Sequence, residues 1–170
     1  MKEKDRKLND RAVQATVELS AQLQGTEFID PGDFSSLTKG YKQLDNDIHR
    51  KTGKLLSTLG FINKQLKANL DAFSELYDNY PERLSEHNED LARTEAVNVG
   101  KCINPIEGYD LDEQQLTAIA YDVRSRLVIA GAGTGKTTTN IRLIKYLLRS
   151  GKASLEEILA LSFTNASVDD

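Results

Sequence analysis

The residues best suited to chemistry form a short glycine-rich turn, Ala130-Gly131-Ala132-Gly133-Thr134-Gly135-Lys136-Thr137. It fits the template G-x-x-x-x-G-K-[ST], except that alanine replaces glycine at the first position. Glycines let successive backbone N–H groups turn inward without a Cβ in the way, and such a concave run of donors binds phosphate oxygens. Lys136 would then reach the β- and γ-phosphates of a nucleotide, and the Thr137 hydroxyl would be placed to ligate magnesium.

A glycine-rich turn can also be a flexible connection without a chemical role. Two features of the flanking sequence favour phosphate binding instead. An apolar run over residues 126–130 predicts a strand before the turn, and residues 137–149 predict a helix after it. Because the positive end of a helix dipole favours a bound anion, this context suits a phosphate group. We therefore predict that residues 130–137 hold the phosphates of a nucleoside triphosphate.

The elements around this loop predict an α/β fold with parallel strands. We expect a helix beginning at Asp112, a buried strand over 126–130, a helix over 137–149 that stops at Gly151, and a second buried strand over 158–163. A strand–helix–strand order with continuous apolar strands is typical of a parallel sheet covered by helices.

Residues 1–100 are expected to be nearly all helical. Apolar residues from Leu37 to Tyr80 fall at steps of three and four, which predicts a long amphipathic helix with a break near Gly53. Pro81 should end this helix, because the residue before a proline resists helical geometry, and a second helix over 82–98 would fold back to form a helical hairpin. The hairpin either buries its own apolar stripe or acts as an arm that docks on a protein partner.

The composition is that of a globular protein, with 39% hydrophobic and 28% charged residues. No apolar run approaches the ~18 residues that a membrane span needs, and the first ten residues have no apolar segment of the export type. The single cysteine, Cys102, cannot form an internal disulfide. We expect a cytoplasmic protein without a membrane partner. Its formal net charge of −4 argues against a wholly basic nucleic-acid surface but leaves local basic grooves open.

Three segments resemble, in this order, motifs of the UvrD/Rep-type helicases of superfamily 1, most closely the helicase IV-like branch. The segment LDEQQLTAI resembles the Q motif, AGAGTGKT resembles the Walker A phosphate loop, and ILALSFTNAS resembles motif Ia. Alanine at the first loop position is usual in that family. The resemblance covers about residues 86–170, and it is specific because the three motifs occur in order at the family's spacing.

For the nucleotide, this resemblance implies ATP and Mg²⁺ as cofactors. Gln115 would recognise adenine, and Lys136 and Thr137 would serve the phosphoryl chemistry, with Thr137 as the magnesium ligand. Thr138 stands at a position where the family often has an arginine that contacts the nucleotide. The alternative for Gln115 is structural: three residues after an Asp112 N-cap, it would complete a capping box.

For DNA, the resemblance implies that Phe163, Thr164 and Asn165 line the path of a single strand. Motif Ia usually continues with a lysine, where this chain has Ala166.

These observations predict a helical N-terminal region over 1–100, a linker over 101–110 and an incomplete P-loop (RecA-like) ATP-binding domain over 111–170. The acidic pair, the arginine finger and the second RecA-like domain that a helicase needs are not recognisable before Asp170. We therefore expect the N-terminal ATP-binding fragment of an ATP-dependent 3′–5′ DNA helicase, which alone neither unwinds DNA nor hydrolyses ATP. The alternatives are a stand-alone helical interaction protein with a vestigial phosphate loop, and another P-loop ATPase or kinase.

Overall fold

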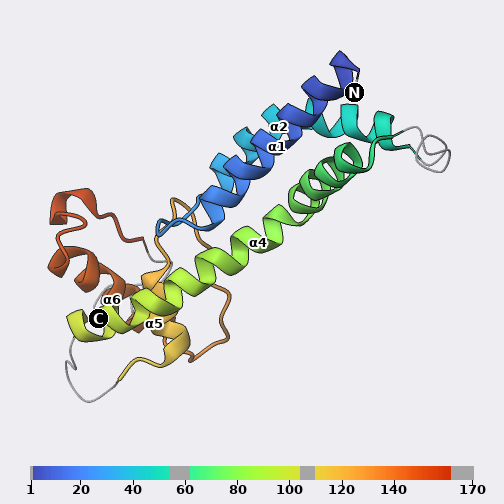
Figure 1. Cartoon of the computed structure of the whole chain (residues 1–170). Coiled ribbons are helices and arrows are strands. Elements are labelled where there is room, and N and C mark those ends of the chain that lie inside the picture. Colours follow the sequence, from blue (N-terminus) through green and yellow to red (C-terminus); the bar gives the residue numbers. More distant parts are fainter. Residues whose placement is uncertain (1, 54–61, 104–109, 162–170) are drawn as a thin grey trace. The chain divides into compact units, whose positions relative to one another are not determined.

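The computed structural model describes residues 2–53, 62–103 and 110–161 of the chain (Figure 1). In chain order its elements are α1 (Glu3–Leu23), α2 (Pro31–Thr52), α4 (Lys64–Ile103), α5 (Glu113–Ala120), α6 (Lys136–Arg149) and a 3-10 helix, η1 (Leu155–Glu157). They form two compact units, residues 1–88 and 89–170, and α4 runs from the first unit into the second.

The predicted α/β fold with parallel strands is wrong, because the described ranges contain helices and irregular segments but no strand. Residues 126–130 and 158–161 are irregular, and 162–163 lie outside the described residues. Four apolar side chains that the strands would have buried are instead 82–88% exposed: Leu127, Ile129, Leu159 and Leu161. A strand forms only through backbone hydrogen bonds to a neighbouring strand. An apolar run indicates that a segment tends to be buried, but it does not determine which neighbouring strand the segment would pair with.

The first unit is built from α1, α2 and the first half of α4. Three polar contacts join α1 to α2 in an antiparallel register: Asp5–Lys51, Arg11–Asp47 and Glu18–Tyr41. Two side-chain hydrogen bonds join α1 to α4 in a parallel register: Asn9–Asn69 and Gln22–Tyr80. The three helices therefore alternate in direction, as in an up-down-up bundle.

The core of this unit is one apolar cluster shared by all three helices. Phe73 and Tyr80 are fully buried, and the ring of Phe73 stacks on that of Tyr77 at a centroid distance of 5.4 Å. Asn88 is also buried; its Oδ1 accepts from the Ile29 N–H at 2.9 Å and its Nδ2 donates to the Ile29 carbonyl at 2.8 Å. A buried amide whose oxygen and nitrogen are both hydrogen-bonded thus fixes the α1–α2 connection onto α4.

The prediction that a helix ends before Pro81 and folds back over 82–98 is also wrong, because α4 continues through Pro81 to Ile103. A proline inside a helix removes one hydrogen bond and crowds the preceding turn, at a cost of ~3 kcal/mol. On either side of it, Tyr80 and Leu84 are both buried in the core. Their burial, at ~1.5–3 kcal/mol for each large apolar side chain, offsets that cost. The predicted break near Gly53 is confirmed, since α2 ends at Thr52.

In the second unit, the last part of α4 contributes buried Ala92, Ala96, Val99 and Ile103. Ile119 and Ala120 of α5 and Tyr146 of α6 are buried in the same unit, and α5 packs against α6. Among the described helices of the chain, none is both long and apolar enough to cross a bilayer.

Candidate functional site

The glycine-rich loop enters α6 through backbone geometry that suits glycine. Gly133 and Gly135 have φ values of 74° and 78°, in the left-handed region, and Gly135 is the N-cap of α6. This region costs a residue with a Cβ roughly 1–2 kcal/mol. Because Gly135 has no side chain, the N-cap residue cannot accept from the first N–H groups of α6. These N–H groups, which have no partner within the helix, therefore gain no acceptor from their N-cap.

Lys136 is the first residue of α6, and its side chain folds back over the loop. Its ammonium donates to the carbonyl of Ala130 at 3.1 Å and to that of Gly131 at 2.5 Å. The Thr134 hydroxyl also donates to the Gly131 carbonyl, at 2.9 Å. The loop carbonyls therefore surround the Lys136 ammonium. This places a positive charge beside the helix N-terminus and beside two glycines in the left-handed backbone conformation. That combination of donors fits a phosphate group.

Gln115 connects the beginning of α5 to the loop. Its N–H donates to Asp112 Oδ1 at 2.8 Å and its Oε1 accepts from the Asp112 N–H at 3.1 Å, which completes a capping box. Its Nε2 donates to the Thr134 carbonyl at 3.2 Å. The capping role considered from sequence is therefore present, and the same carboxamide also holds the loop. Nothing in the sequence pattern signalled this second contact.

The close approach of Gln115 to Gly135 gives a testable difference between two glycines. A Cβ on Gly135 would lie 2.8 Å from Gln115 Nε2, whereas one on Gly133 would meet nothing within 4 Å. Both substitutions to alanine should cost roughly 1–2 kcal/mol through backbone strain. Only Gly135→Ala should also displace the Gln115 carboxamide, seen by NMR as shifted side-chain amide resonances and faster amide exchange at the start of α6. Identical spectra at Gln115 for the two variants would show that the contact does not hold the loop.

Of the other predicted site residues, the structure describes those of the nucleotide site but not those predicted to contact DNA. Thr137 and Thr138 lie in the first turn of α6 with exposed side chains, beside Lys136. Phe163, Thr164 and Asn165, predicted to contact DNA, lie outside the described residues. The structure thus brings Gln115 to the glycine-rich loop through its contact with Thr134, and Lys136 to the same loop through its contact with Gly131.

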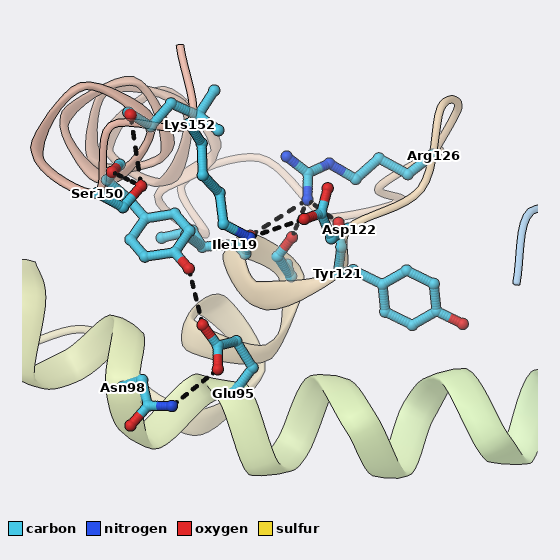
Figure 2. Close-up of polar contacts among 11 residues, drawn as sticks. Glu95, Asn98, Ile119, Tyr121, Asp122, Arg126, Ser150 and Lys152 are labelled. Atoms are coloured by element: carbon cyan, nitrogen blue, oxygen red, sulfur yellow. Dashed lines mark hydrogen bonds and ion pairs between the residues drawn. The ribbon is translucent and has the colours of Figure 1, made fainter. Parts of the chain in front are cut away.

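Two polar contacts fix the far end of α6 (Figure 2). The Tyr146 hydroxyl donates to Glu95 on α4 at 2.9 Å, and Lys152 pairs with Asp122 at 2.7 Å. Burial raises the pKa of Tyr146, and the hydrogen bond to Glu95 adds to the rise. Burial alone would lower the pKa of Lys152, but the hydrogen bonds and charges of Asp122 and Tyr146 together raise it.

Arg126 caps the C-terminal end of α5 (Figure 2). Its Nη1 donates to the carbonyls of Ala118 at 2.9 Å, Ile119 at 3.3 Å and Tyr121 at 2.5 Å. These are carbonyls that a helix C-terminus leaves without an internal partner. α5 is thus capped at both ends, by Asp112 and by Arg126, and this fixes the helix that carries Gln115. The role of Arg126 is not apparent from sequence, because an arginine before an apolar run has no specific pattern.

Comparison with known proteins shows what this loop and its flanking helices are similar to. Residues 111–170 match the UvrD/REP helicase N-terminal domain. The chain is 42% identical over 55 residues to the ATP-dependent DNA helicase UvrD1 of Mycobacterium leprae, and 31% identical over 85 residues to DNA helicase IV of Escherichia coli. These alignments cover 32% and 50% of this chain. No solved structure matches.

Residues 111–170 therefore resemble a segment of the UvrD-like helicases, by their match to the UvrD/REP helicase N-terminal domain and to these two relatives. The resemblance predicted from the three motifs is confirmed. The chain spans only a small part of these relatives, 7% of the UvrD1 protein and 12% of DNA helicase IV.

Proposed function

We propose that residues 130–137 bind ATP with magnesium, as the nucleotide site of a UvrD-like DNA helicase. The observation that carries the proposal is the position of Lys136: its ammonium lies over the loop, beside the start of α6, whose N-cap is a glycine. Phosphate oxygens would accept from the first N–H groups of α6 and from Lys136. Thr137, exposed in the same turn, would hold the magnesium ion, which neutralises phosphate charge when bound.

The proposed activity of the whole protein is ATP-driven 3′–5′ translocation on single-stranded DNA. The relatives' names, ATP-dependent DNA helicase and DNA helicase, support this class. Phe163, Thr164 and Asn165 are proposed to line the DNA path, as in the motif that they resemble. The helical region of residues 1–100 is proposed as a place where a protein partner docks, and residues 111–170 as the ATP-binding domain.

Gln115 is proposed to read the adenine base. A carboxamide offers a donor and an acceptor, which match N7 and N6 of adenine, whereas guanine presents acceptors at both places. Both ends of this carboxamide already make hydrogen bonds, to the Thr134 carbonyl and to the Asp112 N–H. Adenine would therefore replace contacts within the protein, and its preference over guanine should be modest.

Calorimetric titration with ATP-Mg and GTP-Mg tests both the site and its base preference. The chain should bind ATP-Mg more tightly than GTP-Mg, and Gln115→Ala should bring the two affinities together. A guanine contact that leaves a polar group unpaired costs ~1–3 kcal/mol, and this cost is the upper limit of the expected preference. Gln115→Ala should also lose ~0.5–1 kcal/mol of helix stability, because the capping box is removed.

Gln114→Ala is the matched control, since its neighbouring side chain is exposed and lies about 100° around the helix. It should alter neither the base preference nor the melting temperature. If wild type shows no ATP-Mg binding, the loop is vestigial and the helical interaction protein becomes the better hypothesis. If Gln115→Ala lowers stability but keeps the preference for ATP, Gln115 is only a cap and a loop anchor.

A further inference from the structure

A groove on the first unit lies between the beginning of α1 and the end of α2. It has a volume of ≈ 420 Å³, and five of the residues that line it are basic: Lys4, Lys7, Arg11, Arg50 and Lys51. Leu8 contributes apolar surface. The groove belongs to the helical region, which contributes no residue to the proposed nucleotide site.

Two acidic residues in the same groove are already paired. Asp5 pairs with Lys51 at 2.7 Å and Asp47 with Arg11 at 3.2 Å, and both pairs connect α1 to α2. These ion pairs hold the two walls of the groove together. Five basic against two acidic lining residues leave an excess of three positive charges. A cleft lined by one sign of charge concentrates counter-ions of the opposite sign.

Fold stability does not account for the basic residues that remain. Lys4 and Lys7 lie in the first turns of α1, where the helix dipole favours acidic side chains. Among the described residues, Lys7 pairs with Glu3, in an ion pair whose two side chains are both 71% exposed, and such surface pairs contribute little. Lys4 and Arg50 are exposed and make no ion pair with another described residue. Their charges are therefore available to an anionic partner.

We propose that this basic groove binds the phosphodiester backbone of DNA without regard to sequence. None of the eight residues that line it is aromatic. Proteins that hold bases of a single strand stack them on aromatic side chains, so this lining favours phosphates over bases and accepts duplex DNA. The proposal rests on the proposed helicase function, because a DNA helicase must bind DNA independently of its sequence. In this proposal the helical region contributes to that binding.

Fluorescence anisotropy with a labelled mixed-sequence duplex and the full chain tests the groove. Lys4→Gln/Arg50→Gln removes two charges that form no ion pair among the described residues. It should weaken binding about tenfold at low salt and reduce the slope of log affinity against log salt by about 1.8, or ~0.9 for each lost phosphate contact. The matched control, Lys39→Gln/Lys42→Gln, removes two exposed charges of α2 outside the groove. It should change affinity by less than about twofold, because salt screens distant charges.

Equal loss of DNA affinity in the two variants would contradict binding in the groove and would show only an effect of net charge. If polyglutamate displaces the duplex as efficiently as unlabelled DNA at equal charge, the groove is not specific for a phosphodiester backbone. ATP-Mg titration of the same variants separates this proposal from the helicase assignment. If Lys4→Gln/Arg50→Gln alone weakens DNA binding in a chain that binds no ATP, the groove stands and the nucleotide site fails. If ATP binds and the two variants bind DNA equally, the nucleotide site stands and the groove fails.

Discussion

Lys136→Ala should remove most of the ATP-Mg affinity of this chain. In the structure the ammonium of Lys136 donates to two loop carbonyls, and phosphate oxygens would replace these neutral acceptors with charged ones. Hydrogen bonds to charged groups contribute about 1.5–3 kcal/mol, so the dissociation constant should rise about ten- to a hundredfold. Isothermal titration calorimetry measures the change directly. The helix itself should persist, because alanine is the best helix former and α6 is fixed at its far end by Tyr146 and Lys152.

Lys145→Ala provides the matched control for this experiment. Lys145 lies on the same helix, nine residues further along, and carries the same charge. Its loss should leave ATP-Mg affinity nearly unchanged, because the structure places no contact between it and the loop. If Lys136→Ala and Lys145→Ala bind ATP-Mg equally well, residues 130–137 do not cradle a phosphate, and the match to a helicase domain would not extend to nucleotide binding.

The helices of this chain follow closely from sequence, since apolar spacing and caps are local signals. The predicted beginning of a helix at Asp112 and its stop at Gly151 are both confirmed, by an Asp112 N-cap and by a left-handed Gly151 after α6. Pro81 shows the limit of such signals. A local rule ends the helix there, but the burial of Tyr80 and Leu84 around it comes from contacts with distant residues, which no local rule includes.

Local sequence predicts one part of the candidate site and not another. The loop residues could be predicted, because glycines, a lysine and a helix start determine the local backbone geometry. The contact of Gln115 with Thr134 does not, since it joins two segments 19 residues apart. The strands predicted over 126–130 and 158–163 failed for a related reason. Apolar runs were recognised correctly, but pairing depends on neighbours that the pattern of one run cannot specify.

Phe73→Ala should destabilise the first unit more than any other substitution considered for it. Phe73 is fully buried, stacks on Tyr77 at 5.4 Å and meets the edge of Tyr41 at 6.1 Å, so it joins α4 to α2. Replacing a buried phenylalanine by alanine costs about 3–5 kcal/mol, since the cavity adds to the lost transfer energy. For a unit of this size each kcal/mol lowers the melting temperature by roughly 4–8 °C, so a drop of at least about 12 °C is expected. Circular dichroism of the full chain would record it.

Val17→Ala is the control, because Val17 is 62% exposed on α1 and its change should stay within about 0.5 kcal/mol. Both variants should keep the wild-type affinity for ATP-Mg at a temperature where they are folded, since the contacts that shape the loop come from residues 112–136 in the second unit. Similar melting of Phe73→Ala and Val17→Ala would show that the three-helix core is not what holds the first unit together. A parallel loss of ATP-Mg affinity in Phe73→Ala would show instead that the helical core supports the nucleotide site, which would make the helical region part of the machinery that binds ATP.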